Sequence, residues 1–226
     1  METGKKIPQI FIVFGRGGSG KGTQTDLLVK KFNLVYIGSG DLLRQRKNEN
    51  DFTAAKIADF MSKGELAPTS LVFMLWINKL EEMKNTSGDD FPGIIFDGSP
   101  RKLIEAKLLK EALEWYDWDK NIRILLIDIS RREAFDRLAK RRMCQKCGKI
   151  IPYVGEYKNL KSCDACGGEL VVRLDDTPEG INKRLNWYEE EVLPVMEFLE
   201  KDYPIIKING EQSIEDVHKE IMEKIK

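Results

Sequence analysis

The sequence predicts an α/β protein built on a doubly wound, five-stranded parallel sheet. Five short apolar runs, rich in Ile, Val and Phe, lack a clean alternation of apolar and polar residues, as expected of strands buried on both faces. These runs lie at 9–14, 34–37, 93–97, 122–129 and 205–208. Helical patterns separate them, and such alternation is typical of a parallel sheet covered by helices. The expected helices lie near 20–32, 40–48, 53–63, 69–85, 101–114, 131–142, 177–201 and 213–225.

Helix starts are marked at two places, and two stretches interrupt the alternation. Pro178 follows Thr177 in an N-cap and first-turn combination, and Glu133 lies three residues after Ser130, which is the spacing of a capping box. Residues 38–68 form a small helical excursion after the second strand. Residues 143–172 contain every cysteine and two short strand-like pieces, at 149–154 and 169–174.

Composition excludes several classes of protein. The 226 residues contain 37 Lys and Arg against 37 Asp and Glu, so no overall charge attracts nucleic acid or an acidic membrane. No apolar run approaches the roughly 20 residues of a membrane span, and the N-terminus lacks the features of a signal peptide. We therefore expect a cytoplasmic protein. The only histidine, His218, lies among Lys and Glu, which leaves almost no material for histidine-based catalysis.

The first strand is followed by the glycine-rich stretch GRGGSGKGT, in which Gly15, Gly18, Gly20 and Lys21 carry the pattern. Glycines let the backbone turn its N–H groups toward an anion, and the start of the next helix adds a favourable partial charge. Lys21 can then reach the β- and γ-phosphates of a nucleotide. The stretch predicts the phosphate-binding loop of a P-loop NTPase-type fold, with Thr23 one place later than in the common pattern.

Charged residues at the ends of other elements are consistent with phosphoryl transfer. Asp97 ends a buried strand, where a carboxylate suits a Mg²⁺ ion held through its water shell. Arginines recur at element ends, and guanidinium groups stabilise the charge that spreads over phosphate oxygens during transfer. A single arginine of this kind is more often a solvated surface charge. The six are Arg44, Arg101, Arg137, Arg141, Arg173 and Arg184.

The four cysteines form two C-x2-C pairs at a zinc-ribbon spacing: Cys144, Cys147, Cys163 and Cys166. A glycine follows the second cysteine of each pair. Disulfides are disfavoured in a cytosolic chain, and a redox centre would need only one pair at a helix start. Four thiolates close a tetrahedral site, so we expect a structural zinc.

Five motifs in this order resemble those of adenylate kinases: GxxGxGKGTQ, GDLLR, DGSPR, RLAKRR and RLDDTPEGINKRL. With the cysteines, the chain is similar to the zinc-bearing, long-lid bacterial type over about its whole length. The resemblance implies one kinase domain with a core at 1–37, 68–139 and 177–226. It also implies an insertion that binds the nucleoside monophosphate (NMP), at 38–67, and a zinc-bearing lid at 140–176. The implied reaction is MgATP + AMP ⇌ 2 ADP, by a monomer with no nucleic-acid or membrane partner.

The same resemblance implies the site residues. Catalytic roles fall on Lys21, Arg101, Arg141, Arg173 and Arg184. ATP contacts fall on Gly15, Gly18, Ser19, Gly20, Lys21, Gly22, Thr23, Arg137, Arg141, Ile150, Ile151 and Gln212, with Gly210 near the adenine. AMP contacts fall on Ser39, Arg44, Glu65, Ala67, Gly98, Arg101, Glu105, Arg173 and Arg184. Asp97 would hold Mg²⁺ through water, and Asp175 and Asp176 would lock the closed lid.

The chain departs from the family pattern in both nucleotide sites. In the phosphate loop, Arg16 and Gly17 replace a small residue and a proline, which we expect to loosen the loop. In the acceptor site, Ser39 stands for a usual Thr and Ser99 for a usual Phe. Glu105 replaces a Gln that reads the AMP base, and an ionised Glu can only accept hydrogen bonds. The Glu105 carboxylate could accept two hydrogen bonds from one edge of guanine, or one from the amino group of cytosine.

Two alternatives to an AMP-specific kinase remain at this point. One is a kinase with a different or relaxed acceptor base, using GMP, CMP or UMP. The other is a P-loop ATPase switch whose zinc ribbon binds nucleic acid. The ribbon's composition counts against the second, because its acidic and basic residues balance and only two tyrosines could stack on a base. The acidic residues are Glu156, Asp164 and Glu169, the basic residues are Lys149, Lys158 and Lys161, and the tyrosines are Tyr153 and Tyr157.

Overall fold

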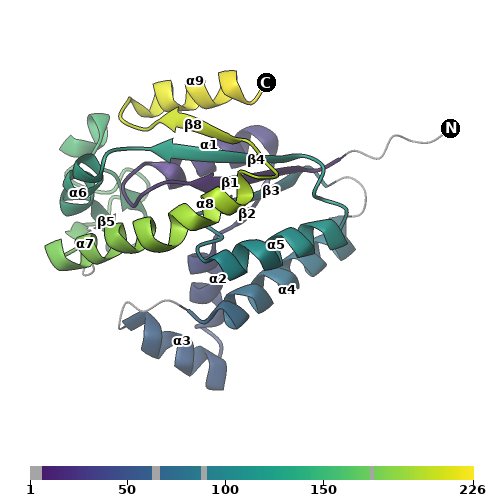
Figure 1. Ribbon diagram of the computed structural model, residues 1–226. Coiled ribbons are helices and arrows are strands. Elements are labelled where there is room, and N and C mark those ends of the chain that lie inside the picture. Colours follow the sequence, from purple (N-terminus) through teal and green to yellow (C-terminus); the bar gives the residue numbers. More distant parts are fainter. Residues whose placement is uncertain (1–6, 63–66, 88–90, 174–175) are drawn as a thin grey trace.

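The computed structural model describes residues 7–62, 67–87, 91–173 and 176–226, and its centre is a five-stranded parallel sheet (Figure 1). The strand order is β2-β3-β1-β4-β8. The strands are β1 (Gln9–Phe14), β2 (Val35–Ile37), β3 (Gly93–Asp97), β4 (Ile122–Asp128) and β8 (Ile205–Asn209). The predicted fold class is therefore confirmed, and each strand ends within one residue of its expected bounds.

Helices cover both faces of the sheet, because successive residues of a strand point to opposite sides. On one face, Phe11 and Val13 of β1 pack with α1 (Lys21–Phe32) and α9 (Ile214–Lys224). On the other, Ile10 and Ile12 pack with the remaining large helices. These are α4 (Thr69–Ser87), α5 (Leu103–Trp115) and the run formed by α7 (Pro178–Trp187), the π turn η2 (Tyr188–Val192) and α8 (Leu193–Leu199). The core is thus apolar on both faces of every central strand.

Two of the predicted helices need correction. The single helix expected at 177–201 is interrupted by the π turn η2, although Thr177 caps its start by accepting a hydrogen bond from the N–H of Gly180, at 3.1 Å. The helix expected at 131–142 is α6 (Arg131–Lys140), and Arg142 already begins a strand. Ser130 caps α6 through the N–H of Glu133, but the Glu133 carboxylate accepts from Arg137, so the reciprocal half of the capping box is lost.

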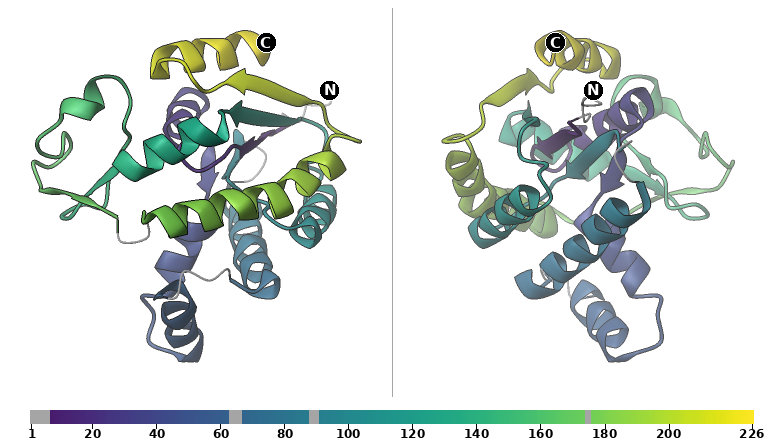
Figure 2. Two further views of the ribbon diagram at one scale, coloured as in Figure 1. Left: turned by 60° about the vertical axis from the view of Figure 1, so that its left-hand side comes forward. Right: turned by 90° about the vertical axis from the view of Figure 1, so that its right-hand side faces the viewer.

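The helical excursion consists of α2 (Ser39–Arg46) and α3 (Phe52–Ser62), which project away from the sheet (Figures 1 and 2). A second projection follows α6. It contains the antiparallel strands β5 (Arg142–Cys144), β6 (Ile150–Ile151) and β7 (Leu170–Val172), in the order β6-β5-β7, and the 3-10 turn η1 (Gly155–Asn159). Among the described residues, none of the helices combines the length and apolarity needed to cross a bilayer.

Candidate active site

The phosphate loop connects β1 to α1 at the carboxyl edge of the sheet. Gly20 precedes α1 with φ 88°, a left-handed conformation that glycine adopts without strain. Gly15 lies so close to β4 that a β-carbon there would come within 2.6 Å of the carbonyl oxygen of Ile127. The N–H of Ser19 donates to the carbonyl of Arg16 at 3.1 Å, which closes the turn. Because the first N–H groups of a helix have no intrahelical acceptor, the loop and the start of α1 form an anion site.

Lys21 lies at the meeting point of several charges. A β-carbon at position 98 would lie 3.0 Å from the Cε atom of Lys21, so Gly98 leaves room for this side chain. Burial lowers the pKa of Lys21, and the Asp97 carboxylate opposes that shift. The charges of Arg101, Arg141 and Arg184 lower it further, and a β-carbon at position 98 would also lie 3.9 Å from an amino group of Arg101. Such a concentration of positive charge suits a polyphosphate.

Asp176 gathers two of these arginines from different elements. The Nε and one amino group of Arg141 donate to the two carboxylate oxygens of Asp176, both at 2.8 Å. Arg184 on α7 also donates to Asp176. Burial alone would raise the pKa of Asp176, but the hydrogen bonds from Arg141 and Arg184 outweigh it, so the pKa lies below its ordinary value of 3.8. Asp176 is one of the two residues expected to lock the lid; the other, Asp175, lies outside the described residues.

Asp97 ends β3 beside the phosphate loop, as expected. Its Oδ1 atom is buried and has no hydrogen-bond partner in the part of the chain that the structure describes. Its Oδ2 atom accepts from the hydroxyl of Tyr36 at 3.5 Å, and a β-carbon on Gly22 would lie 3.7 Å from the same atom. An unpartnered buried carboxylate oxygen is costly, and a hydrated divalent cation would satisfy it. The position therefore fits Mg²⁺ held through water.

The predicted contacts of the ATP base lie where α6 meets the loop after β8. Arg137 is 8% exposed, and its guanidinium donates to the Glu133 carboxylate at 2.6 Å and to the carbonyl of Gly210 at 3.0 Å. A cavity of about 30 Å³ lies beside it, between the phosphate loop and the second projection. Its walls include Gly18, Ser19, Gly20, Thr23, Arg137, Gly210 and Gln212, all of them residues for which ATP contacts were predicted.

Five residues of this cavity escaped the sequence analysis: Gln24, Pro152, Val154, Ile214 and Val217. Ile150 and Ile151 were expected here, but the second projection contributes Pro152 and Val154 instead. Ile151 is 1% exposed and pairs with Arg142 across β5 and β6, so it belongs to the small sheet. The apolar run at 150–154 was the available signal for Pro152 and Val154, but it does not reveal which face each residue occupies. A larger hollow of about 560 Å³ continues along η1 toward residues 211–215.

On the acceptor side, the start of α2 is joined to the loop after β3. The hydroxyl oxygens of Ser39 and Ser99 lie 2.6 Å apart, and the indole N–H of Trp76 donates to the Ser39 hydroxyl at 3.2 Å. All three residues are buried, as is Ala67. Arg44 is exposed, with one amino group donating to Asp41 at 2.6 Å. Ser39, Ala67, Gly98, Arg44 and Arg101 thus lie on elements bordering one region, while Glu65 lies outside the described residues.

Glu105, the residue predicted to read the acceptor base, is 4% exposed, and its carboxylate bonds the backbone near the start of α5. Its Oε2 atom accepts hydrogen bonds from the backbone N–H groups of Arg101, at 2.7 Å, and Lys102, at 3.3 Å. Lys102 precedes α5 and has no side-chain oxygen with which to cap it, while the Glu105 carboxylate bonds the N–H groups of Arg101 and Lys102 just before the helix begins. Arg173 is half-buried and directly follows β7, at the end of the second projection.

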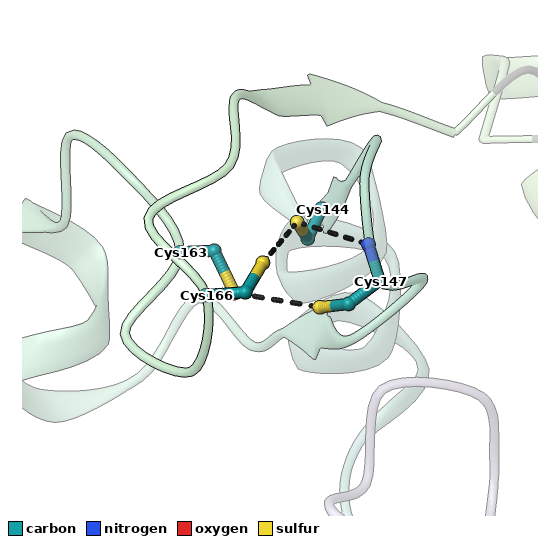
Figure 3. Close-up of side chains that lie close together, drawn as sticks. All are labelled: Cys144, Cys147, Cys163 and Cys166. Atoms are coloured by element: carbon teal, nitrogen blue, oxygen red, sulfur yellow. Dashed lines mark hydrogen bonds between the residues drawn. The ribbon is translucent and has the colours of Figure 1, made fainter.

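The four cysteines converge in the second projection (Figure 3). Their Sγ atoms all lie within 4.8 Å of one another, with 3.4 Å between Cys144 and Cys166 and 3.7 Å between Cys147 and Cys163. The N–H of Cys147 donates to the sulfur of Cys144 and lowers the pKa of that thiol to about 6. Each pair lies in a tight turn. Four clustered sulfurs with a low-pKa thiol fit a tetrahedral thiophilic metal such as zinc.

A parallel sheet with this loop, and with arginines from several elements around one lysine, defines a phosphotransferase of the P-loop class, because charge stabilisation and positioning are what phosphoryl transfer needs. The family model described as adenylate kinase matches residues 13–203. The chain belongs to the adenylate kinase family.

Named relatives cover nearly the whole chain. A protein of Petrotoga mobilis called adenylate kinase is 35% identical over 212 residues, which span 93% of this chain and 94% of that protein. An adenylate kinase of Methanocella arvoryzae is 35% identical over 209 residues, spanning 92% and 94%. One of Thermococcus sibiricus is 33% identical over 216 residues, spanning 93% and 91%. These matches do not favour the alternative of an ATPase switch with a nucleic-acid-binding ribbon.

Proposed function

We propose that this protein transfers the γ-phosphoryl group of MgATP to AMP, reversibly, and so forms two ADP. The observation that carries the proposal is the gathering of cations beside the phosphate loop. A β-carbon on Gly98 would lie 3.0 Å from the Cε atom of Lys21 and 3.9 Å from an amino group of Arg101. Arg141 and Arg184 both donate to Asp176. These arginines come from the loop after β3, from the start of the second projection and from α7. A site assembled from separate elements can bring two anionic substrates together and release the products when the elements separate.

The donor half consists of the phosphate loop and Lys21. The loop's N–H groups bind the β- and γ-phosphates of ATP, and Lys21 follows the charge that moves to the β–γ bridging oxygen as the bond breaks. Asp97 holds the water shell of Mg²⁺, an ion that would neutralise part of the phosphate charge when bound. Arg137 and the loop at Gly210 and Gln212 border the space for the adenine.

The acceptor half consists of Arg44, Arg101 and the start of α2. Arg44 and Arg101 bind the phosphate of AMP and orient its oxygen toward the γ-phosphorus. Arg141, Arg173 and Arg184 stabilise the equatorial oxygens of the transferring group. In the substrate-free arrangement, Arg141 and Arg184 both donate to Asp176, so the repulsion between these two cations is offset before the substrates bind.

Residues 38–67 are the NMP-binding insertion and residues 140–176 are the lid in this proposal. Both close over the substrates and exclude water, which prevents the γ-phosphoryl group from reaching water instead of AMP. The protein acts as a monomer in the cytoplasm.

Zinc would be held by Cys144, Cys147, Cys163 and Cys166, and its role would be structural. All four thiolates are needed to complete a tetrahedron, which leaves no open position for a substrate. The lid has few large apolar side chains of its own, so a metal would replace the core that it lacks.

The test of the proposed reaction is a comparison of AMP, GMP, CMP and UMP as acceptors with MgATP. We expect ADP formation with AMP at the highest kcat/KM. ATP hydrolysis that needs no acceptor would contradict the proposal. A preference for GMP or CMP over AMP would also contradict it.

A further inference from the structure

Arg16 lies inside the phosphate loop and reaches out of it to two other elements. One amino group donates to the Oδ1 atom of Asp128, at 3.3 Å, and to the carbonyl of Ile129, at 3.1 Å, where β4 ends. The other amino group donates to the Oε1 atom of Glu189, at 3.4 Å, and the guanidinium lies over the ring of Tyr188, 5.1 Å from its centre. The Arg16 side chain is only 18% exposed.

The backbone of Arg16 also takes part in the loop's turn, because its carbonyl accepts the N–H of Ser19. A side chain fixed at position 16 therefore restricts the turn that directs the N–H groups toward the phosphates. The sequence led us to expect a looser loop, since Gly17 lacks the φ restriction of a proline. The contacts of Arg16 oppose that loosening.

The partners of Arg16 lie at the π turn η2, which is anchored from a second side. The Oε2 atom of Glu189 accepts from Arg131 at 2.8 Å, and Arg131 also donates to Asn186 at 2.6 Å. Glu189 thus lies between Arg131, at the start of α6, and Arg16, in the phosphate loop. π turns are rare and frequently occur at functional sites.

The same helical run positions the arginines of the active site. One turn before Glu189, Arg184 is bonded to Asp176, and the guanidinium of Arg101 lies over the ring of Trp187, 5.9 Å from its centre. Residues 184–189 therefore contact three parts of the site: the phosphate loop, an arginine of the acceptor side and the carboxylate of the lid.

We propose that Arg16 is a positioning residue for phosphoryl transfer: it fastens the phosphate loop to η2, so that the loop's N–H groups and Lys21 stay in register with Arg101 and Arg184. The inference rests on the proposed function. Arg16 touches neither the reacting atoms nor the nucleotide in this account. It acts through Glu189 and Tyr188, and it takes over the stiffening that a proline at position 17 would supply.

The test measures kcat and KM for both substrates in Arg16→Ala, Glu189→Gln and their double variant, with Glu190→Gln as the matched control. Glu190 is exposed on the same turn, so its substitution makes the same charge change without touching Arg16. We expect Arg16→Ala to lower kcat/KM for ATP about tenfold, with KM for AMP within twofold of wild type. Because the two residues act together, the double variant should be no worse than Arg16→Ala.

A rescue variant separates positioning from a general loss of structure. Arg16→Ala combined with Gly17→Pro should regain most of the lost kcat/KM, because the proline restricts the loop by another means. Three results would each overturn the proposal: a change under twofold in Arg16→Ala, equal effects of Glu189→Gln and Glu190→Gln, or losses that multiply in the double variant.

A measurement without turnover keeps this inference distinct from the proposed function. If wild type forms no ADP, the proposed function fails. The proposed contact between Arg16 and η2, which we call the clamp, is then tested by the Kd of ATP from calorimetry. We expect Arg16→Ala to weaken ATP binding about tenfold and Glu190→Gln to leave it unchanged. An equal Kd in wild type and Arg16→Ala would overturn the clamp whichever acceptor the enzyme uses.

Discussion

At the scale of single residues, the proposed catalytic role of Lys21 is the easiest to test, because this side chain lies beside the phosphate loop and close to Gly98 and Asp97. We predict that Lys21→Met lowers kcat about a thousandfold, since it removes a cation that stabilises the transition state. The folded structure should persist, because methionine retains the apolar stem of the side chain. Lys30→Met is the control, exposed on the same helix. Turnover near that of wild type in Lys21→Met would refute the assignment of the phosphate loop.

The Asp176 carboxylate makes a prediction about pH. Its pKa is lowered in the folded state, so its contribution to the free energy of unfolding is present above about pH 4 and is lost as the pH falls through the lowered value. Asp176→Asn should destabilise the protein by about 2 kcal/mol at pH 7, because the three charge-assisted hydrogen bonds from Arg141 and Arg184 are weakened. The difference from wild type should shrink below pH 4.

Urea unfolding at several pH values measures this difference, with the exposed Asp136→Asn as control. A difference between wild type and Asp176→Asn that stays constant from pH 7 to pH 3 would show that Asp176 does not act through its charge.

Glu105 joins a structural and a proposed specificity role in one side chain. In Glu105→Gln, the amide oxygen can still accept from the N–H of Arg101, so α5 keeps its cap, while the amide nitrogen adds the donor that adenine N1 requires. We predict that the preference for AMP over GMP rises about tenfold. The exposed Glu111→Gln on the same helix is the control. An unchanged order of the four acceptors would mean that Glu105 only caps the helix.

At the scale of elements, the lid is the part whose stability we expect to depend on metal. Structural zinc contributes roughly 10–16 kcal/mol of apparent binding energy to small metal-binding folds. Chelation should therefore lower the Tm and increase hydrogen exchange in residues 142–172. Activity should partly survive at low temperature, because no catalytic group is removed.

Metal analysis, calorimetry and hydrogen exchange before and after chelation test this, and zinc is added back as the control for reversibility. A stoichiometric metal whose removal leaves the Tm unchanged would argue against a structural role. So would a metal-bound water that titrates in the pH–rate profile.

The elements also show what local sequence patterns could predict. The five strands were predicted to within one residue because burial on both faces makes each a short apolar run. The cysteine cluster was predicted from spacing alone. The π turn η2 was missed, since its side-chain partners lie far away in the chain: Glu189 is 173 residues from Arg16. Pro152 and Val154 were missed because an apolar run does not indicate which face meets a ligand.

The acceptor site gives another case in which packing, and not pattern, decided the outcome. In the family pattern that the sequence resembles, a Phe stands where this chain has Ser99. The structure places Trp76 of α4 in the same buried cluster, hydrogen-bonded to Ser39, which is bonded in turn to Ser99. The large aromatic side chain thus comes from a different element, and no local pattern pairs positions 76 and 99.

At the scale of the whole molecule, two projections extend from the core that carries the phosphate loop, and we propose that they supply charge and shield the reaction from water. The helical run from α7 to α8 connects these parts. It carries Arg184 toward the lid and Glu189 toward the phosphate loop, and it packs against the sheet through Tyr188 and Val195. This one helical run therefore contacts several of the elements that border the site.

The most direct test of the central claim starts from MgADP alone and follows all nucleotides and inorganic phosphate by chromatography. We predict that ADP is converted to ATP and AMP in equal amounts with no release of phosphate, because the proposed site would bind two nucleotides and exclude water. Lys21→Met should leave the ADP unchanged. Release of phosphate, or wild-type protein that leaves ADP intact, would contradict the account.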